Sequence, residues 1–471
     1  MAANSLFAYI EGLYAPVHDE LDVCLKLKGD RPEVIGSYAQ NNPNPQFKPD
    51  GLYHWFDGDG MIHGVYFDGH EARYRNRYVM TDGFRLEAAA KKNLWRGILE
   101  PIDFENPHGP DKDTANTDLI FHNGQLLATW WLSGQPYTID PRTFETIGVS
   151  EINGPTKEKI AAHPKRDPNT GELICFSYNP YSPPYLQSCV ISADGTLTHH
   201  ATIDCPEPSL FHDIAISQNF TIFMDLPMVW DPKAIAQGRR KVRFHRDRPA
   251  RFGVMKRHGD GSQIQWFERP ACYIYHTVNA WEEEDAAGNT VLVMIACRIE
   301  NPLPSTMHDT ELHIPRLFFL RLEPYVTEFR FNLGTGQSSE RQLDDTPTEF
   351  PRMNDTYLTS RSRYAYHPRI AKEPTLLFDG CVRYDFETGE KSVISYGPDC
   401  FGSETVFAPR IGSQSENDGY VVMYVSNRRE DWTELRFYDA QTMSEQPVSS
   451  FRLPRRVPIG FHAEWADLSQ G

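Results

Sequence analysis

The chain has 471 residues, of which 40% are hydrophobic and 24% are charged. This balance is typical of a globular protein with a large buried core, and it excludes a disordered, collagen-like or coiled-coil chain. Lys and Arg number 47 against 64 Asp and Glu, which gives a net charge of −17. Such an acidic surface repels phosphate backbones, so we expect no nucleic-acid partner.

Two further features of the composition bear on where the protein works. No apolar run is long enough to span a membrane, and the first residues lack the pattern of a secretory signal. The eight cysteines are scattered without a CxxC pair, which favours reduced core residues and argues against a zinc site. We therefore expect a cytoplasmic protein. The basic segment 239–257 could touch anionic lipid or an acidic partner, or it could be a solvated loop balanced by acidic residues elsewhere in the fold.

Turn signals occur along nearly the whole chain, and each is flanked by a short run of alternating or β-branched apolar residues. Only the stretches near 8–14 and 84–95 look helical. Asp-Gly and Asn-Gly pairs supply the positive φ angles of tight hairpins, so each signal predicts two antiparallel strands. In chain order, the signals are Asp68-Gly69, Asn123-Gly124, Asn169-Thr170-Gly171, Asp194-Gly195, Gly288-Asn289, Thr388-Gly389 and Asp418-Gly419.

At least seven hairpins in a chain of this length predict an all-β fold. A β-propeller fits the length better than a sandwich, because radial closure leaves only short strand edges. No tryptophan-aspartate or kelch repeat is visible, so this prediction depends on the number of hairpins. No linker divides the chain, and we expect a single domain over residues 1–471.

Four of the 17 histidines have apolar or aromatic neighbours at strand or turn boundaries: His163, His212, His276 and His462. Imidazole in such surroundings is buried and neutral, and neutral imidazole is a common metal ligand. The four residues are too far apart in sequence to share a hairpin or helix. In a propeller, however, inner strands from different blades converge on one axis.

The segments around these histidines resemble the carotenoid cleavage oxygenase family, which also includes stilbene- and phenylpropanoid-cleaving enzymes. The resemblance extends over nearly the whole chain. The matching segments include YHWFDGDGMIHGVYF (53–67), DTANTDLIFHNGQLLA (113–128), AHPKRDPNTGEL (162–173), FHDIAISQNFTIFMDLP (211–227), WFERPACYIYHTVNAWEE (266–283), TEFPRMN (348–354), SETVFAPR (403–410) and VPIGFHAEW (457–465).

The resemblance implies a seven-bladed β-propeller with a helical and loop dome over an axial iron site. His163, His212, His276 and His462 match the four ligands of a non-haem Fe(II), one per chain. The implied reaction adds both atoms of O2 across a conjugated C=C bond of a hydrophobic alkene and yields two carbonyl products. Glu349 and Glu404 match two glutamates that accept hydrogen bonds from the ligand histidines.

The chain departs from the family pattern at the third such glutamate, because LATWWLSGQPY (127–137) has Trp131 or Leu132 at the matching position. One histidine, plausibly His212, must then rely on a backbone carbonyl, a water or a different acid. The Lys of the phenol-binding relatives falls at Trp130 or Trp131, and their Tyr falls near Ile98.

These replacements favour an apolar substrate tunnel and an apocarotenoid or carotenoid substrate. Cleavage of a stilbene or phenylpropanoid remains an alternative, as does a non-cleaving carotenoid-binding or isomerase-like protein. We expect at most weak peripheral membrane contact, through residues 228–257.

Overall fold

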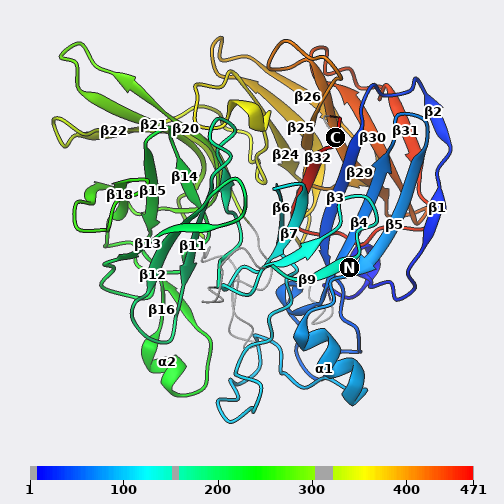
Figure 1. The fold of residues 1–471 in the computed structure, drawn as a ribbon, viewed down its shortest axis with the longest axis horizontal. Helices are drawn as coiled ribbons and strands as arrows, with labels where there is room; N and C mark the ends of the chain where they lie inside the picture. The colour runs from blue at the N-terminus through cyan, green and yellow to red at the C-terminus, as the bar shows by residue number, and fades with distance from the viewer. Residues whose placement is uncertain (1–7, 151–158, 303–321, 470–471) are drawn as a thin grey trace.

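The computed structural model describes residues 8–150, 159–302 and 322–469 (Figure 1). These ranges consist mainly of short antiparallel strands in radially arranged sheets. The first sheet has five strands in the order β1-β5-β4-β3-β32. Its members are β1 (Asp22–Cys24), β3 (Gly36–Pro43), β4 (Gly60–Phe67), β5 (Ala72–Tyr78) and β32 (Ala463–Asp467).

Four sheets of four strands each follow in chain order. The first is β6 (Asp118–His122), β7 (Gln125–Thr129), β8 (Tyr137–Ile139) and β9 (Thr146–Val149). The second is β10 (Lys165–Arg166), β11 (Leu173–Tyr178), β12 (Leu186–Ile191) and β13 (Leu197–Ile203). The third is β14 (Ile214–Ile216), β15 (Phe220–Asp225), β18 (Ala250–Lys256) and β19 (Gln265–Arg269), with the added pair β16 (Met228–Trp230) and β17 (Val242–Phe244). The fourth is β20 (Tyr273–Glu284), β21 (Thr290–Ile299), β22 (Pro324–Asn332) and β23 (Ser338–Gln342).

The last sheet is a fusion of two blades. One blade is β24 (Tyr364–Ile370), β25 (Phe378–Asp385) and β26 (Lys391–Ser395). The other is β28 (Val406–Pro409), β29 (Gly419–Asn427), β30 (Trp432–Asp439), β31 (Ser449–Arg452) and β2 (Leu27–Gly29). The short strand β27 (Cys400–Gly402) pairs with both β25 and β29 and joins them into one sheet. The described residues therefore form a seven-bladed β-propeller, as the sequence predicts.

Six of the seven turn signals lie in connections between antiparallel strands with their Gly at positive φ, and Asn123-Gly124 forms a two-residue connection between β6 and β7. The seventh hairpin, β28 and β29, is present, but Asp418-Gly419 is not its turn, because Gly419 already opens β29 and is not at positive φ. The helix prediction was less accurate. Helix α1 (Asp82–Ala90) starts where the Thr81 hydroxyl accepts from Phe84 N and ends because Lys91 is left-handed, with a φ of 56°. It therefore stops short of residue 95. The stretch near 8–14 forms only the short 3-10 turn η1 (Gly12–Tyr14).

The remaining described helical segments are short. Helix α2 (Pro232–Ala236) begins where the Asp231 carboxylate accepts from two main-chain N–H groups. In Figure 1 both α helices lie below the strands. The 3-10 turns η2 (Trp55–Asp57) and η5 (Asp355–Tyr357) complete this group. The part of the chain that the structure describes contains no helix long and apolar enough to cross a membrane.

Strand β3 closes the ring of blades. It pairs on one side with β4 and on the other with β32 near the end of the chain, in a register that places Gly36 opposite Asp467 and Gln40 opposite Ala463. Strands from both ends of the chain thus share one blade. Because β3 is paired on both sides, neither of its edges faces solvent, and every residue of the strand is buried.

Aromatic side chains fill the spaces between and within the blades. Phe252 of β18 packs on Phe329 and Phe331 of β22, with ring centroids 5.1 and 5.2 Å apart. Removing such a buried ring typically costs about 3–5 kcal/mol of stability. Gly64 of β4 permits the close approach of Phe144, since a Cβ at that position would lie 2.3 Å from the ring.

The basic segment 239–257 is largely paired with acidic residues elsewhere in the fold, and much of it forms β17 and β18. The structure thus favours internal charge balance, although the segment is not the loop that the sequence suggested. The ion pairs are Arg240–Asp111, Arg243–Asp231, Arg248–Glu207, Arg251–Asp225 and Arg257–Asp167. All eight cysteines are free, and seven are buried; Cys24 is exposed, contrary to its predicted place in the core.

Candidate metal centre

The four predicted histidines converge from four different sheets. His163 lies just before β10, His212 just before β14 and His462 directly before β32, whereas His276 lies within β20. All four are at most 9% exposed. Three of them thus lie just before a strand at one edge of their sheet, namely β10, β14 or β32, from which side chains of separate blades can reach a common axis.

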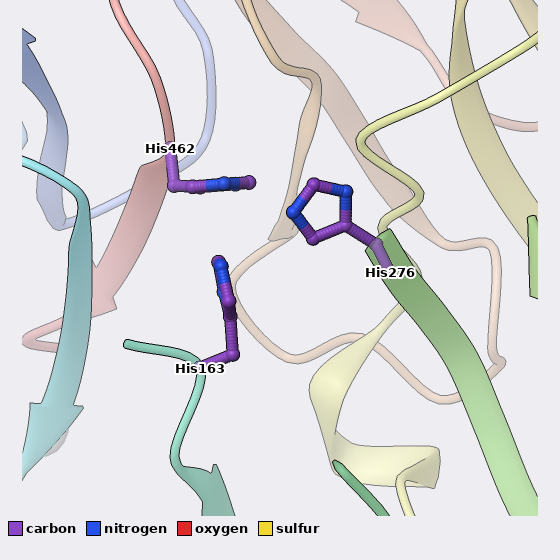
Figure 2. Close-up of side chains that lie close together, drawn as sticks. All are labelled: His163, His276 and His462. Carbon is purple, nitrogen blue, oxygen red and sulfur yellow. The ribbon is translucent and has the colours of Figure 1, made fainter. Parts of the chain in front are cut away.

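The imidazole rings form a compact cluster. Ring centroids are 4.4 Å apart for His163 and His462, 4.7 Å for His276 and His462, and 4.8 Å for His163 and His276. One ring nitrogen from each of these three residues lies within 4.8 Å of the others (Figure 2). His212 packs against His163 and His276 at 4.9 and 5.1 Å but lies outside that group of three nitrogens.

The chemistry of these nitrogens suits a metal ion. Burial and the neighbouring imidazoles hold the pKa values of His163, His212 and His276 well below 6.5. Burial lowers the pKa of His462 to about 4. The rings are therefore neutral, and the buried Nε2 atoms of His163 and His276 have no hydrogen-bond partner among the described residues. Free imidazole lone pairs that face one another fit a divalent cation such as Fe(II).

Two buried glutamates that the sequence analysis singled out contact the rings. Glu349 Oε2 lies 2.7 Å from His276 Nδ1, and Glu404 Oε1 lies 3.0 Å from His462 Nδ1. A proton on Nδ1 directs the Nε2 lone pair toward the centre of the cluster. Burial raises the pKa of Glu349 well above its usual range and that of Glu404 to about 8. A bound cation would favour their charged forms.

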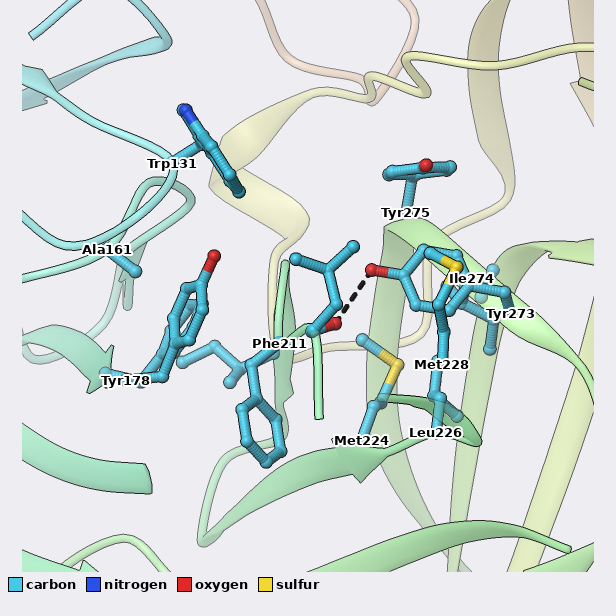
Figure 3. Close-up of a cluster of buried hydrophobic side chains, with 14 of the residues drawn as sticks. Trp131, Ala161, Tyr178, Phe211, Met224, Leu226, Met228, Tyr273, Ile274 and Tyr275 are labelled. Carbon is cyan, nitrogen blue, oxygen red and sulfur yellow. Dashed lines mark hydrogen bonds between the residues drawn. The ribbon is translucent and has the colours of Figure 1, made fainter. Parts of the chain in front are cut away.

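An apolar cavity adjoins one side of the histidine cluster. Aromatic side chains dominate its wall, and His212, His276 and His462 reach it. The other lining residues include Trp55, Phe56, Trp131, Tyr275, Leu322, Phe350, Leu376 and Phe461. Figure 3 shows Trp131 and Tyr275 at one edge of the buried cluster beside it.

The three residues predicted to line a substrate tunnel do not share one wall. Trp131 lines the apolar cavity, whereas Trp130 and Ile98 line a neighbouring, more polar cavity. Phe56 borders both cavities. The adjacent Trp130 and Trp131 rings make an edge contact at 6.3 Å, and the two indoles point into different spaces.

Comparison with known proteins gives the chain its family. The model of the family described as "Retinal pigment epithelial membrane protein", which is that of the carotenoid cleavage oxygenases, matches residues 14–467. The chain is a carotenoid cleavage oxygenase family member.

Curated relatives and solved structures in the family match almost the whole chain. The carotenoid 9,10(9',10')-cleavage dioxygenase of Crocus sativus is 36% identical over 98% of this chain and 89% of its own. The carotenoid cleavage oxygenase of Mycobacterium tuberculosis (strain H37Rv) is 31% identical over 99% and 98%. The crystal structure of Pseudomonas brassicacearum lignostilbene dioxygenase superposes with a TM-score of 0.86 at 28% identity, covering 98% of both chains. Cobalt-substituted Synechocystis ACO gives 0.83 at 25%, covering 96% and 97%.

This family member lacks the expected third glutamate, and the structure places a carboxylate elsewhere. Trp131 occupies the cavity wall beside His212, and among the described residues no hydrogen bond to the His212 imidazole is found. Instead Asp118 Oδ2 lies 3.0 Å from Nδ1 of His163. Sequence analysis did not identify Asp118. Its only signal is an acidic residue at the start of an apolar strand, within a segment that matches the family.

Sequence analysis also missed a group of polar residues on the other side of the histidines from the aromatic wall. Asp213, next to His212, lies 2.7 Å from Lys165 Nζ and accepts hydrogen bonds from the main chain and hydroxyl of Thr277 at 2.7 and 2.9 Å. Lys165 is two residues from His163, and Thr277 follows His276. This Lys165–Asp213–Thr277 clamp therefore joins the segments that carry three of the four histidines.

A second ion pair lines the same cavity as the Lys165–Asp213–Thr277 clamp, on the side of the histidines away from the aromatic wall. Arg352 Nη2 lies 2.7 Å from Glu464 Oε2. Arg352 is three residues after Glu349, and Glu464 is two residues after His462. The pair thus ties the segment that orients His276 to the strand that follows His462.

Proposed function

We propose that the protein is a non-haem Fe(II) dioxygenase that cleaves a conjugated C=C bond of an apocarotenoid or carotenoid into two carbonyl products. His163, His212, His276 and His462 would hold one iron per chain. Membership of the family supports the activity. The single observation that carries it is the position of the neutral imidazoles, which border an apolar, aromatic cavity.

When bound, Fe(II) with neutral nitrogen ligands supplies the site at which O2 reacts with the alkene. The overall reaction is balanced without a reductant: the C=C bond breaks, each carbon takes one oxygen atom, and the alkene provides the four electrons. The protein therefore has no proton or hydride to deliver. Its residues hold the metal, place the double bond and exclude water.

The aromatic wall performs the last two tasks. Trp55, Phe56, Trp131, Phe350 and Phe461 present flat apolar surfaces on which an extended polyene can stack. Phe350 packs edge-on against His462, with centroids 4.4 Å apart, so the wall reaches the metal ligands themselves. A double bond held on this surface would lie beside the imidazoles in a space poor in water.

The charge of the cavity favours a polyene over a phenol. No lysine or arginine is among the described residues that line it, and a buried phenolate needs a cation nearby. The Tyr275 hydroxyl is buried without a hydrogen-bond partner in the described part of the chain. It can donate a hydrogen bond to a substrate oxygen, but it cannot balance a negative charge.

Side-by-side assays of the iron-loaded protein with an apocarotenal and a 4-hydroxystilbene under ¹⁸O2 would test the proposal. We expect consumption of one O2 per apocarotenal, two labelled carbonyl products and about one iron per chain. His276→Ala should lose both iron and turnover, because one nitrogen donor is removed. His258→Ala, which alters an exposed imidazole, is the matched control and should change neither.

The competing functions give different results in the same assay. Cleavage of the hydroxystilbene alone would replace the apocarotenoid with a phenolic substrate. Binding or isomerisation of the polyene without O2 consumption would show a non-cleaving protein. Failure to retain iron after anaerobic reconstitution would contradict the dioxygenase proposal as a whole.

A further inference from the structure

Asp118 opens strand β6, and all of its hydrogen bonds point inward. Oδ2 lies 3.0 Å from His163 Nδ1 and accepts from the His163 main-chain N–H at 3.2 Å. Oδ1 accepts from Leu119 N at 2.8 Å. The residue is only 6% exposed. A carboxylate buried with three donors is fully satisfied without water.

The residue that Asp118 contacts is conformationally unusual. His163 has a φ of 64°, in the left-handed region that non-glycine residues seldom adopt. Such strain persists only where the surroundings hold it in place. Asp118 binds both the main chain and the ring of His163, so one side chain fixes the backbone and the direction of the imidazole together.

Three carboxylates accept from the Nδ1 atoms of three histidines: Asp118 for His163, Glu349 for His276 and Glu404 for His462. The family pattern has three glutamates in this role, and the third is absent here. In its place Trp131 forms part of the apolar wall, and its main-chain N–H donates to Thr117, the residue before Asp118. The histidine cluster therefore still has three carboxylate partners, but the third is Asp118 and not a glutamate at the position of Trp131.

We propose that Asp118 is the third carboxylate of the metal centre and a positioning residue for His163, in place of the missing glutamate. The inference depends on the proposed function only in that the cluster holds a metal. It follows that His163 is held through its ring, whereas His212 is held through its neighbour Asp213. Asp118 and Trp131 belong to the same blade, β6 to β9, so the carboxylate at the start of β6 leaves the cavity wall at Trp131 free to remain apolar.

Co(II) is a suitable probe, because a solved relative contains cobalt. Metal-free wild type, Asp118→Asn and Asp113→Asn would be titrated with Co(II), with visible spectra recorded at each step. We expect Asp118→Asn to bind about 10–100-fold more weakly, as for other partners of ligand histidines, and to give a changed ligand-field spectrum. Asp113→Asn is the matched control. Asp113 lies in the same segment and accepts from Ala115 N and Gln135 N, and it has no contact with the histidine cluster among the residues that the structure describes.

Equal Co(II) affinity in Asp118→Asn and wild type would overturn the inference and leave the proposed function intact. Absence of Co(II) and Fe(II) binding by wild type would instead contradict the proposed function. A second measurement needs no variant: ¹⁵N NMR of the metal-free protein should find the His163 proton on Nδ1. A proton on Nε2 would overturn the inference even if Asp118→Asn failed to fold.

Discussion

Each glutamate beside the histidine cluster contributes a shape and a charge, and the two can be separated. In Glu349→Gln and Glu404→Gln the amide oxygen can still accept a hydrogen bond from Nδ1, at 2.7 or 3.0 Å. The negative charge, which makes the imidazole a more basic metal ligand, is lost. We therefore expect both variants to fold and to lose about 10–100-fold in kcat. Steady-state O2 consumption, with iron content measured on the same samples, tests this expectation.

Glu416→Gln is the matched control for this pair. Glu416 also accepts main-chain hydrogen bonds, from Arg363 and Tyr364, and within the described ranges it has no contact with the four clustered histidines. Its substitution should leave kcat unchanged. If Glu349→Gln and Glu404→Gln behaved like Glu416→Gln, the two glutamates would be packing residues and would not tune the metal ligands.

Single residues differ in how far the sequence alone revealed them. Glu349 and Glu404 stood out because their motifs match the family, and both contact histidines in the structure; their part in activity stays a prediction. Asp118 did not stand out, because its role depends on a contact with His163, 45 residues away, that exists only once two blades are packed. Trp130 and Trp131 show the same limit. The sequence places them in one tunnel, but adjacent side chains point to different cavities.

Among the elements, local signals predicted well and non-local pairings did not. Asp-Gly and Asn-Gly turns are encoded within two residues, and all seven predicted hairpins are present. Helix α1 ends earlier than predicted because Lys91 adopts the left-handed conformation. A lysine at that position does not predict such an end, since glycine or asparagine is the usual signal. The pairing of β3 with β32 and the joining of two blades through β27 depend on residues far apart in the chain. Turn chemistry carries no information on either.

The Lys165–Asp213–Thr277 clamp yields a prediction for the elements that carry the histidines. Lys165→Met keeps the length of the side chain but leaves the buried Asp213 carboxylate without its cationic partner, with only the neutral donors of Thr277 and the main-chain N–H of Ile214. We expect a loss of about 1–3 kcal/mol in the free energy of unfolding. We also expect weaker Co(II) binding, because the segments of His163 and His212 are no longer tied together.

Lys112→Met separates these two effects. Lys112 also bridges two carboxylates, those of Asp59 and Glu87, each at 2.5 Å, but it lies away from the histidines. Urea unfolding and Co(II) titration of both variants should show destabilisation in each and weaker metal binding only in Lys165→Met. Equal Co(II) affinity in the two variants would mean that the clamp stabilises the fold without positioning the ligands.

At the scale of the whole molecule, buried histidines make stability depend on pH. Burial lowers the pKa of His63 to about 3, and its Nδ1 pairs with the Tyr74 hydroxyl at 2.8 Å. The unfolded chain takes up a proton below about pH 6.5, whereas the folded chain does so only near pH 3. Stability from this residue is therefore complete above pH 6.5 and is lost as the pH falls. The loss at pH 5 is about 2 kcal/mol.

His63→Gln removes this proton uptake and should reduce the loss of stability between pH 7 and pH 5 by about that amount. Urea unfolding of the metal-free protein at the two pH values provides the measurement. His70→Gln changes an exposed imidazole in the same hairpin and should behave as wild type. An unchanged pH dependence in His63→Gln would show that His63 binds protons equally in the folded and unfolded protein, which would contradict the lowered pKa.

The closure of the ring by β3 and β32 also sets an order of events in biosynthesis. His462 directly precedes β32, so the fourth imidazole and the closing strand leave the ribosome together, after all the other blades. A chain that stopped before residue 462 would lack one nitrogen donor and would leave β3 with an unpaired edge. With the proposed ligands, such a truncated chain would also hold iron more weakly than the chain of 471 residues.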